Sequence, residues 1–129
     1  MATGITQGTV IEDSVAVFLV RIAGVDGVNL TQASLTAVSY AVFDPDGQEI
    51  LSGDLVIADV IFDTLQTGDP RWERCCPSDV EGFNFRHVMP ATAFPTGGAT
   101  NRVEYKFTDT NGYVYHKPFD AKVLAIRTS

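Results

Sequence analysis

The most constraining feature of this sequence is a strict alternation of apolar and charged residues that leads into a tight turn. The alternation covers residues 102–108, and Asn111-Gly112 follows it. A period of two is typical of a β-strand with one face in a core and the other in water. Asn-Gly is the preferred pair in short hairpin turns. The sequence therefore predicts an antiparallel hairpin in which residues 113–117 return and Pro118 marks an edge or bend.

Other short β-rich runs lie between clusters of turn residues, and no segment has a sustained helical period. The run 14–22 is apolar on both faces, which indicates a central strand. Residues 90–94 have the length of one helical turn. The pattern predicts an all-β, antiparallel β-sandwich of seven to nine strands with one short helical turn. The remaining predicted strands are residues 35–43, 48–51, 54–62, 83–88 and 119–126.

The chain length of 129 residues fits one domain spanning residues 1–129. Apolar residues make up 45% of the chain, which is enough for a core without a disulfide or metal. Residues 1–9 are small and polar and are predicted to form an N-terminal arm or an edge strand. Residues 63–81 contain glycine and prolines and are predicted to form one long loop, a feature that is often functional.

The charge of the chain disfavours two classes of partner. It carries 16 acidic and 9 basic residues, a net charge of −7, and the basic residues are scattered. Binding to phosphate backbones or anionic membranes depends on clustered positive charge, so we expect no direct contact with nucleic acid or membrane. The sequence has no apolar run long enough to span a bilayer and no signal-peptide pattern. Its two cysteines are adjacent and form no disulfide framework, which predicts synthesis in a reducing cytosol.

The candidate reactive groups all have simpler interpretations. The turns at residues 44–47 and 109–112 resemble the start of a calcium loop but lack its later glutamate, so we interpret both as hairpin turns. Cys75 and Cys76 are adjacent, whereas structural zinc sites space their cysteines. No serine lies in a nucleophile-elbow pattern. We therefore expect no catalytic residue, no metal and no cofactor.

Two groups of residues are candidates for binding. Trp72 lies between Arg71 and Arg74, and these residue types are enriched in interface hot spots; Trp72 could equally anchor the long loop. Ile5 in the arm and Arg127 near the C-terminus complete the predicted interface residues. The second group could stack on sugars or bases, or form cross-strand core contacts. Its members are Tyr105, Phe107, Tyr113, Tyr115 and Phe119.

From about residue 12 onward, the order of features resembles that of the phage baseplate upper protein N-terminal domain family. The resemblance implies an immunoglobulin-like sandwich, a structural role in a tailed-phage virion and no active-site residues. Domains of that family usually continue into a fibre or trimerisation region, whereas the sequence here ends at Ser129. The features are the strand near residues 15–20, Phe43-Asp44-Pro45-Asp46-Gly47, Glu81-Gly82-Phe83-Asn84-Phe85, Met89-Pro90-Ala91-Thr92-Ala93-Phe94-Pro95, and the hairpin at residues 103–112.

These observations together predict a non-enzymatic virion protein, made in the host cytoplasm, which binds through loops and edge strands. A capsid decoration, or cement, protein fits its small size and acidity, and a neck, head–tail connector or tail/baseplate protein is the alternative. The expected partners are other virion proteins (major capsid, neck or tail proteins), with copies of the chain forming a homo-oligomer or symmetric array. A carbohydrate-binding or adhesin module is the alternative from another class, because of the aromatic residues.

Overall fold

The computed structural model describes residues 6–67 and 82–125. Within these residues the chain forms eight strands and three short helical turns. The strands are β1 (Thr6–Ile11), β2 (Ala16–Val20), β3 (Leu35–Phe43), β4 (Glu49–Leu55), β5 (Ile61–Gln66), β6 (Phe83–Met89), β7 (Thr100–Asp109) and β8 (Val114–Leu124), and the helical turns are η1 (Gln32–Ser34), α1 (Ile57–Val60) and η2 (Ala91–Ala93).

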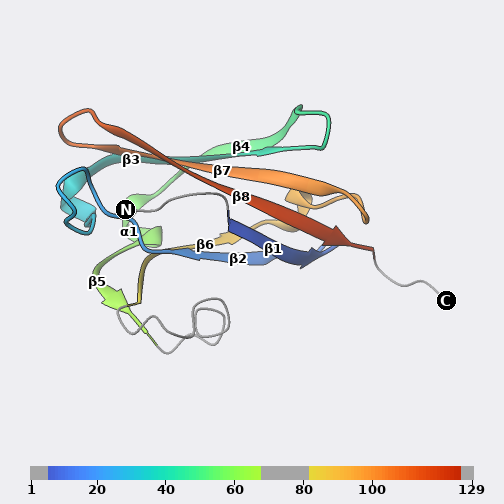
Figure 1. The fold of residues 1–129 in the computed structure, drawn as a ribbon, viewed down its shortest axis with the longest axis horizontal. Coiled ribbons are helices and arrows are strands. Elements are labelled where there is room, and N and C mark those ends of the chain that lie inside the picture. Colours follow the sequence, from blue (N-terminus) through green and yellow to red (C-terminus); the bar gives the residue numbers. More distant parts are fainter. Residues whose placement is uncertain (1–5, 68–81, 126–129) are drawn as a thin grey trace.

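The strands form two sheets packed face to face. The five-stranded sheet has the order β1-β8-β7-β3-β4 and the three-stranded sheet has the order β2-β6-β5. Figure 1 shows β3, β4, β7 and β8 in one layer and β2, β6 and β5 in the other. The inner three strands of the larger sheet and all three of the smaller one follow the immunoglobulin order. The predicted all-β sandwich is confirmed.

The hairpin predicted from alternation and Asn-Gly is confirmed. Val103, Tyr105 and Phe107 of β7 are completely buried, while the residues between them reach the outer face. β8 pairs antiparallel with β7 along its length and passes through Pro118 without a break. Pro118 lies one residue before the pairing of β8 with β1 begins, so its missing N–H is tolerated at this partly open edge.

The predicted arm forms an edge strand from Thr6 onward, as β1. It pairs in parallel with β8, with Thr6 opposite Phe119 and Ile11 opposite Leu124. After Ile11 the chain turns through Asp13, whose φ of 55° lies in the left-handed region that aspartate tolerates. The chain then enters the other sheet as β2.

The prediction that residues 14–22 form a central strand was wrong. β2 is the edge strand of the three-stranded sheet and pairs only with β6. In immunoglobulin domains the first strand lies beside the second strand in this sheet. Here the first strand pairs with the last strand of the opposite sheet, so β2 has no described neighbour on its other side.

Two connections differ from the sequence prediction. Residues 54–62 contain the end of β4, the helical turn α1 and the start of β5, so the chain crosses between sheets through a turn that buries Val60. The predicted loop 63–81 begins too early, because Asp63 to Gln66 belongs to β5. The predicted helical turn at residues 90–94 is confirmed as η2.

Aromatic rings from both sheets form the centre of the core. Tyr105 of β7 contacts Phe18 of β2, Phe85 of β6 and Phe119 of β8 edge-on, with ring centroids 5.9, 4.8 and 5.9 Å apart. Edge-to-face pairs add stability beyond the area they bury. This cluster fixes the spacing of the two sheets and so places the loops at each end. None of the helices in the described ranges has the length and hydrophobicity needed to cross a bilayer.

Candidate binding surfaces

The predicted interface residues lie outside the part of the chain that the structure describes. This is true of Ile5, Arg71, Trp72, Arg74 and Arg127, and also of the two cysteines. Their roles stay predictions.

The two turns that resemble calcium loops use their carboxylates to close the turn. Oδ1 of Asp44 accepts hydrogen bonds from the backbone N–H groups of Asp46 and Gln48, at 3.0 and 2.9 Å. Oδ1 of Asp109 does the same for Asn111 and Tyr113, at 2.9 Å each. The interpretation as turns is confirmed. Among residues 6–67 and 82–125, no three His, Cys, Asp or Glu side chains are grouped so as to hold a metal ion.

The aromatic hairpin is mainly core rather than a stacking platform. Tyr105 and Phe107 are fully buried and Phe119 is 6% exposed. Tyr115 is half-buried, and only Tyr113, at 54%, presents most of its side chain to water. The arrangement therefore removes the observation that motivated a carbohydrate-binding module.

One end of the sandwich carries exposed apolar side chains on its loops. Residues 22–30 fold back as a small hairpin, closed by hydrogen bonds from the Gly24 N–H to the Val28 carbonyl and from the Leu30 N–H to the Ile22 carbonyl. Val25 and Val28 at its tip are 71% and 64% exposed. Tyr113 lies on the neighbouring β7–β8 turn. We call this group the loop-end surface, defined by Val25, Asp26, Val28, Asn111 and Tyr113.

A hollow of about 240 Å³ separates the two loops of this surface. Its lining includes Asp26 and Asn29 from the first loop and Asp109 and Asn111 from the second, with Tyr115 between them. The lining contains two carboxylates and no lysine or arginine. The hollow is therefore acidic, with an apolar rim.

Hydrogen bonds hold the two loops in fixed positions. The Tyr115 hydroxyl accepts from the Val25 N–H at 3.0 Å and donates to Oδ2 of Asp109 at 3.1 Å. The Thr110 N–H donates to the Ser34 carbonyl at 3.0 Å. Partial burial and the Asp109 carboxylate raise the pKa of Tyr115, so its hydroxyl keeps its proton at neutral pH. The loop-end surface is thus preorganised, which lowers the entropic cost of binding.

Sequence reasoning missed this surface because its two loops are far apart in the chain. A signal was present in residues 24–29, where two valines lie within a Gly- and Asp-rich turn. Valine is unusual in such a segment unless it packs or binds. The pairing of this loop with the β7–β8 turn follows only from the sandwich topology.

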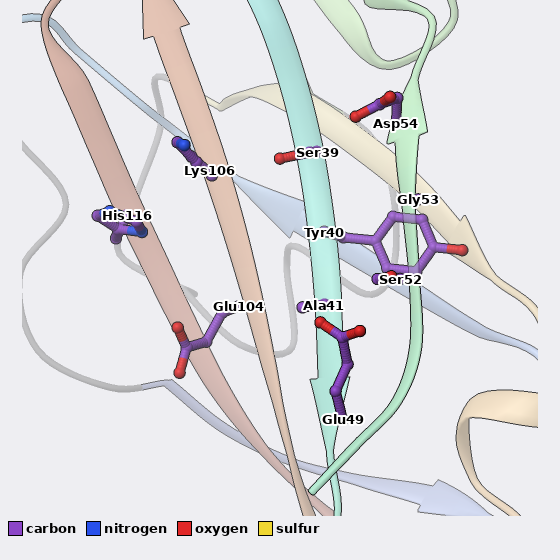
Figure 2. A pocket seen from close by; sticks show the side chains of 10 residues that line it. All are labelled: Ser39, Tyr40, Ala41, Glu49, Ser52, Gly53, Asp54, Glu104, Lys106 and His116. Atoms are coloured by element: carbon purple, nitrogen blue, oxygen red, sulfur yellow. The ribbon is translucent and has the colours of Figure 1, made fainter.

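A second hollow lies on the outer face of the five-stranded sheet, where about 410 Å³ opens above β3. Figure 2 shows Glu104 and Lys106 on one side of β3 and Glu49 and Asp54 on the other. The hollow forms above Ser39 and Ala41, two β3 residues with small side chains that are flanked by longer side chains from β7 and β4.

The strand registers order this groove into rows. His116, Lys106, Ser39 and Asp54 lie opposite one another across β8, β7, β3 and β4. The groove thus holds one lysine and three carboxylates, Glu49, Asp54 and Glu104, on a solvated face where charge interactions contribute little. The groove suits a polar segment of another molecule but gives it no enclosed, dry environment.

The groups whose pKa values shift most are buried between the sheets. Burial lowers the pKa of His87 to about 4, and its Nδ1 shares a hydrogen bond of 2.8 Å with the Tyr105 hydroxyl. Burial also raises the pKa of Tyr105 and lowers that of Lys117. These groups face the core, so their shifts report on packing and not on a binding surface.

Comparisons of this chain with protein-family models, with curated proteins and with solved structures found no match.

Proposed function

We propose that this domain is a non-enzymatic binding module that attaches to a partner protein through its loop-end surface. The observation that carries the proposal is the pair of loops, fixed by the Tyr115 hydroxyl, that present Val25 and Val28 to water beside an acidic hollow. Loops held by a rigid sandwich are a common way to present a binding surface. Exposed apolar residues at such a tip are typical of contact sites.

The chemistry of the surface selects the kind of partner. The rim is apolar, whereas Asp26 and Asp109 in the hollow are acidic and have no basic neighbour in the lining. A protein surface with an apolar patch and a nearby lysine or arginine complements both properties. The net charge of −7 also favours a basic partner surface.

Within this class we propose a structural protein of a tailed-phage virion, and most readily a capsid decoration protein. Support comes from the resemblance to the phage baseplate upper protein N-terminal domain family and from the sandwich fold that the resemblance implied. A repeated lattice would convert the modest affinity of one loop-end surface into firm attachment, because many copies bind together. A neck, connector or tail position uses the same contact with fewer copies.

The test has two parts. Mass spectrometry of purified phage particles that carry this protein should find it, and its ratio to the major capsid protein separates a decoration role from a neck or tail role. Absence from the particles would overturn the virion proposal. Val28→Asp should weaken attachment at least about tenfold, a loss of about 1.4 kcal/mol.

The chain offers a matched control for that variant. Val56 is 63% exposed, close to the 64% of Val28, and lies beside α1 outside the loop-end surface. Val56→Asp should therefore leave attachment unchanged. Equal effects of the two substitutions would show that the loop-end surface is not the contact.

A further inference from the structure

The edge of β2 lacks the devices that usually protect an open strand. Residues Ala16 to Val20 contain no charge, proline, glycine or bulge. Unprotected edges of this kind pair readily with other strands. β2 has β6 on one side and no described strand on the other.

Two of the other three edges, those formed by β4 and β5, are protected, and the third, β1, is weakened by Gly8 in its interior. β4 carries Glu49 and Asp54, and its register with β3 shifts between Val42 and Phe43. β5 contains Asp63, and its pairing with β6 is irregular. The contrast singles out β2 as the edge most open to a partner strand.

The outer face beside this edge is also largely apolar, with one charged residue, Arg86 of β6, opposite Leu19. Val17 and Leu19 of β2 are half-buried, and Val88 of β6, opposite Val17, is 43% exposed. Val15, just before the strand, is 63% exposed. An antiparallel sheet that faces water on one side normally has polar residues there. The face therefore resembles one that is covered in an assembly.

We propose that β2 pairs antiparallel with β2 of a second copy of this chain, about a two-fold axis at Phe18. This inference goes beyond the proposed function, because it concerns contact between copies of the chain and not attachment through the loop-end surface. The three-stranded sheets of the two copies then join as one sheet of six strands, in the order β5-β6-β2-β2-β6-β5. Addition of a strand to an open edge supplies main-chain hydrogen bonds without requiring a preformed pocket.

The sequence of β2 is self-complementary in this register. With Phe18 on the axis, all five residues of the strand are paired, and Val17 lies opposite Leu19 of the second copy on the outer face. Arg21 lies opposite Val15 of the second copy and not opposite the other Arg21. The like charges are thus kept apart, and the arginine stem can cover an exposed valine. A two-fold contact of this kind is closed and yields a dimer.

Charge predicts how the dimer responds to salt. Each copy carries −7, so the copies repel one another at long range, whereas the paired residues Ala16 to Val20 are uncharged. Added salt screens the repulsion and should strengthen the dimer. Binding through the acidic loop-end hollow should instead weaken as salt is added, which distinguishes the two contacts.

The first experiment is sedimentation of the full chain with a reducing agent over a roughly hundred-fold concentration range. The mass should rise from 14.0 kDa toward twice that value. Val17→Lys should remain monomeric and Val56→Lys should dimerise like the parent chain. A parent chain that stays monomeric throughout, or a dimer that survives Val17→Lys, would overturn the proposal.

A second substitution separates edge pairing from stacking of the outer faces. Val88 lies on the same face as Val17 but on the central strand β6. Edge pairing predicts a larger loss of dimer for Val17→Lys than for Val88→Lys. The reverse order would show that the faces stack, and edge pairing would be wrong.

The third measurement uses the native chain, so it does not depend on how a variant folds. Hydrogen exchange followed residue by residue should show alternate amides of Ala16 to Val20 protected at least about tenfold more at high than at low concentration. Equal rates at both concentrations would overturn the proposal. Val28→Asp should leave this protection unchanged, whereas Val17→Lys should leave attachment through the loop-end surface intact, so each proposal can fail alone.

Discussion

β7 and β2 lie in opposite sheets and differ in the polarity of the residues on their outward faces. Along β7, buried Val103, Tyr105 and Phe107 alternate with residues that line the polar groove of the outer face. Along β2, Phe18 and Val20 fill the core, while Val17 and Leu19 on the other face are also apolar. β7 is a central strand and β2 is an edge strand.

Apolar residues on both faces of a strand therefore do not by themselves indicate that the strand is central. A strand in which apolar and polar residues alternate needs no further partner. Its apolar face packs in the core of its own domain and its polar face is solvated. A strand that is apolar on both faces needs a second covering, which another layer of the same chain or another molecule can supply. The four predictions that follow test this contrast, beginning with the largest effect.

Phe107→Ala should be the most damaging change on β7. Its ring is fully buried and contacts Phe85 edge-on at 5.1 Å. Removing it leaves a cavity, and we expect the free energy of unfolding to fall by about 3–5 kcal/mol in urea titrations. Lys106→Ala, one residue away on the outer face, should change it by less than about 0.5 kcal/mol. Similar losses for both would contradict the contrast between the faces.

Asn84 on β6 tests how much the hydrogen bonds to the backbone that follows β2 contribute to stability. Its side chain is 1% exposed, accepts a hydrogen bond from the Ile22 N–H and donates to the carbonyls of Ile22 and Leu30. Asn84→Leu leaves the buried Ile22 N–H and Leu30 carbonyl without this partner, while the Ile22 carbonyl keeps the Leu30 N–H, and we expect a loss of about 2–3 kcal/mol in the same urea titrations. The hairpin at residues 22–30 should also exchange its amides faster. A loss below about 1 kcal/mol would show that water replaces the amide.

His87 tests whether the inner face of the three-stranded sheet is as dry as that of β7. Burial lowers its pKa to about 4 from 6.5, so between these values the unfolded chain binds more protons than the folded chain. The stability present above pH 6.5 should therefore fall by about 2–3 kcal/mol as the pH approaches 4. Unfolding titrations across this range should show a shallower fall for His87→Gln. Identical slopes would mean that His87 titrates normally.

Lys117 is the exception to the alternation within the five-stranded sheet. It lies on the inner side of β8, is 5% exposed, and its Nζ is 5.5 Å from the Phe119 ring centroid. Burial lowers its pKa, and no ion pair to it is present in the described part of the chain. Lys117→Met should raise the free energy of unfolding at neutral pH by about 1 kcal/mol, as seen by a higher denaturant midpoint. A loss of stability would show that the charge is well accommodated.

The fold was predictable where the chain encodes it locally. The alternation of residues 102–108 and the Asn-Gly turn specify β7, the turn and β8, and the helical turn before Phe94 follows from its flanking prolines. The position of β2 was not predictable, because apolar residues on both faces fit a central strand and also fit an edge strand whose outer face is covered. The parallel pairing of β1 with β8 joins the first and last described strands, a contact that no local pattern encodes.

The candidate surfaces were less accessible from sequence than the fold. Trp72 and its arginine neighbours stand out by composition but lie outside the described residues. The loop-end surface depends on the Tyr115 hydroxyl reaching Val25, ninety positions away in the chain. The turn at residues 109–112 was predicted correctly, yet its neighbour across the hollow follows only from the three-dimensional arrangement.

The parallel pairing of β1 and β8 has a mechanical consequence. Both strands run in the same direction, with Thr6 beside Phe119 and Ile11 beside Leu124. A pull applied between the start of β1 and the end of β8 would slide the two strands past each other and load all their hydrogen bonds at once, instead of peeling them apart one by one. We expect such a geometry to resist force and to unfold abruptly once that force is exceeded.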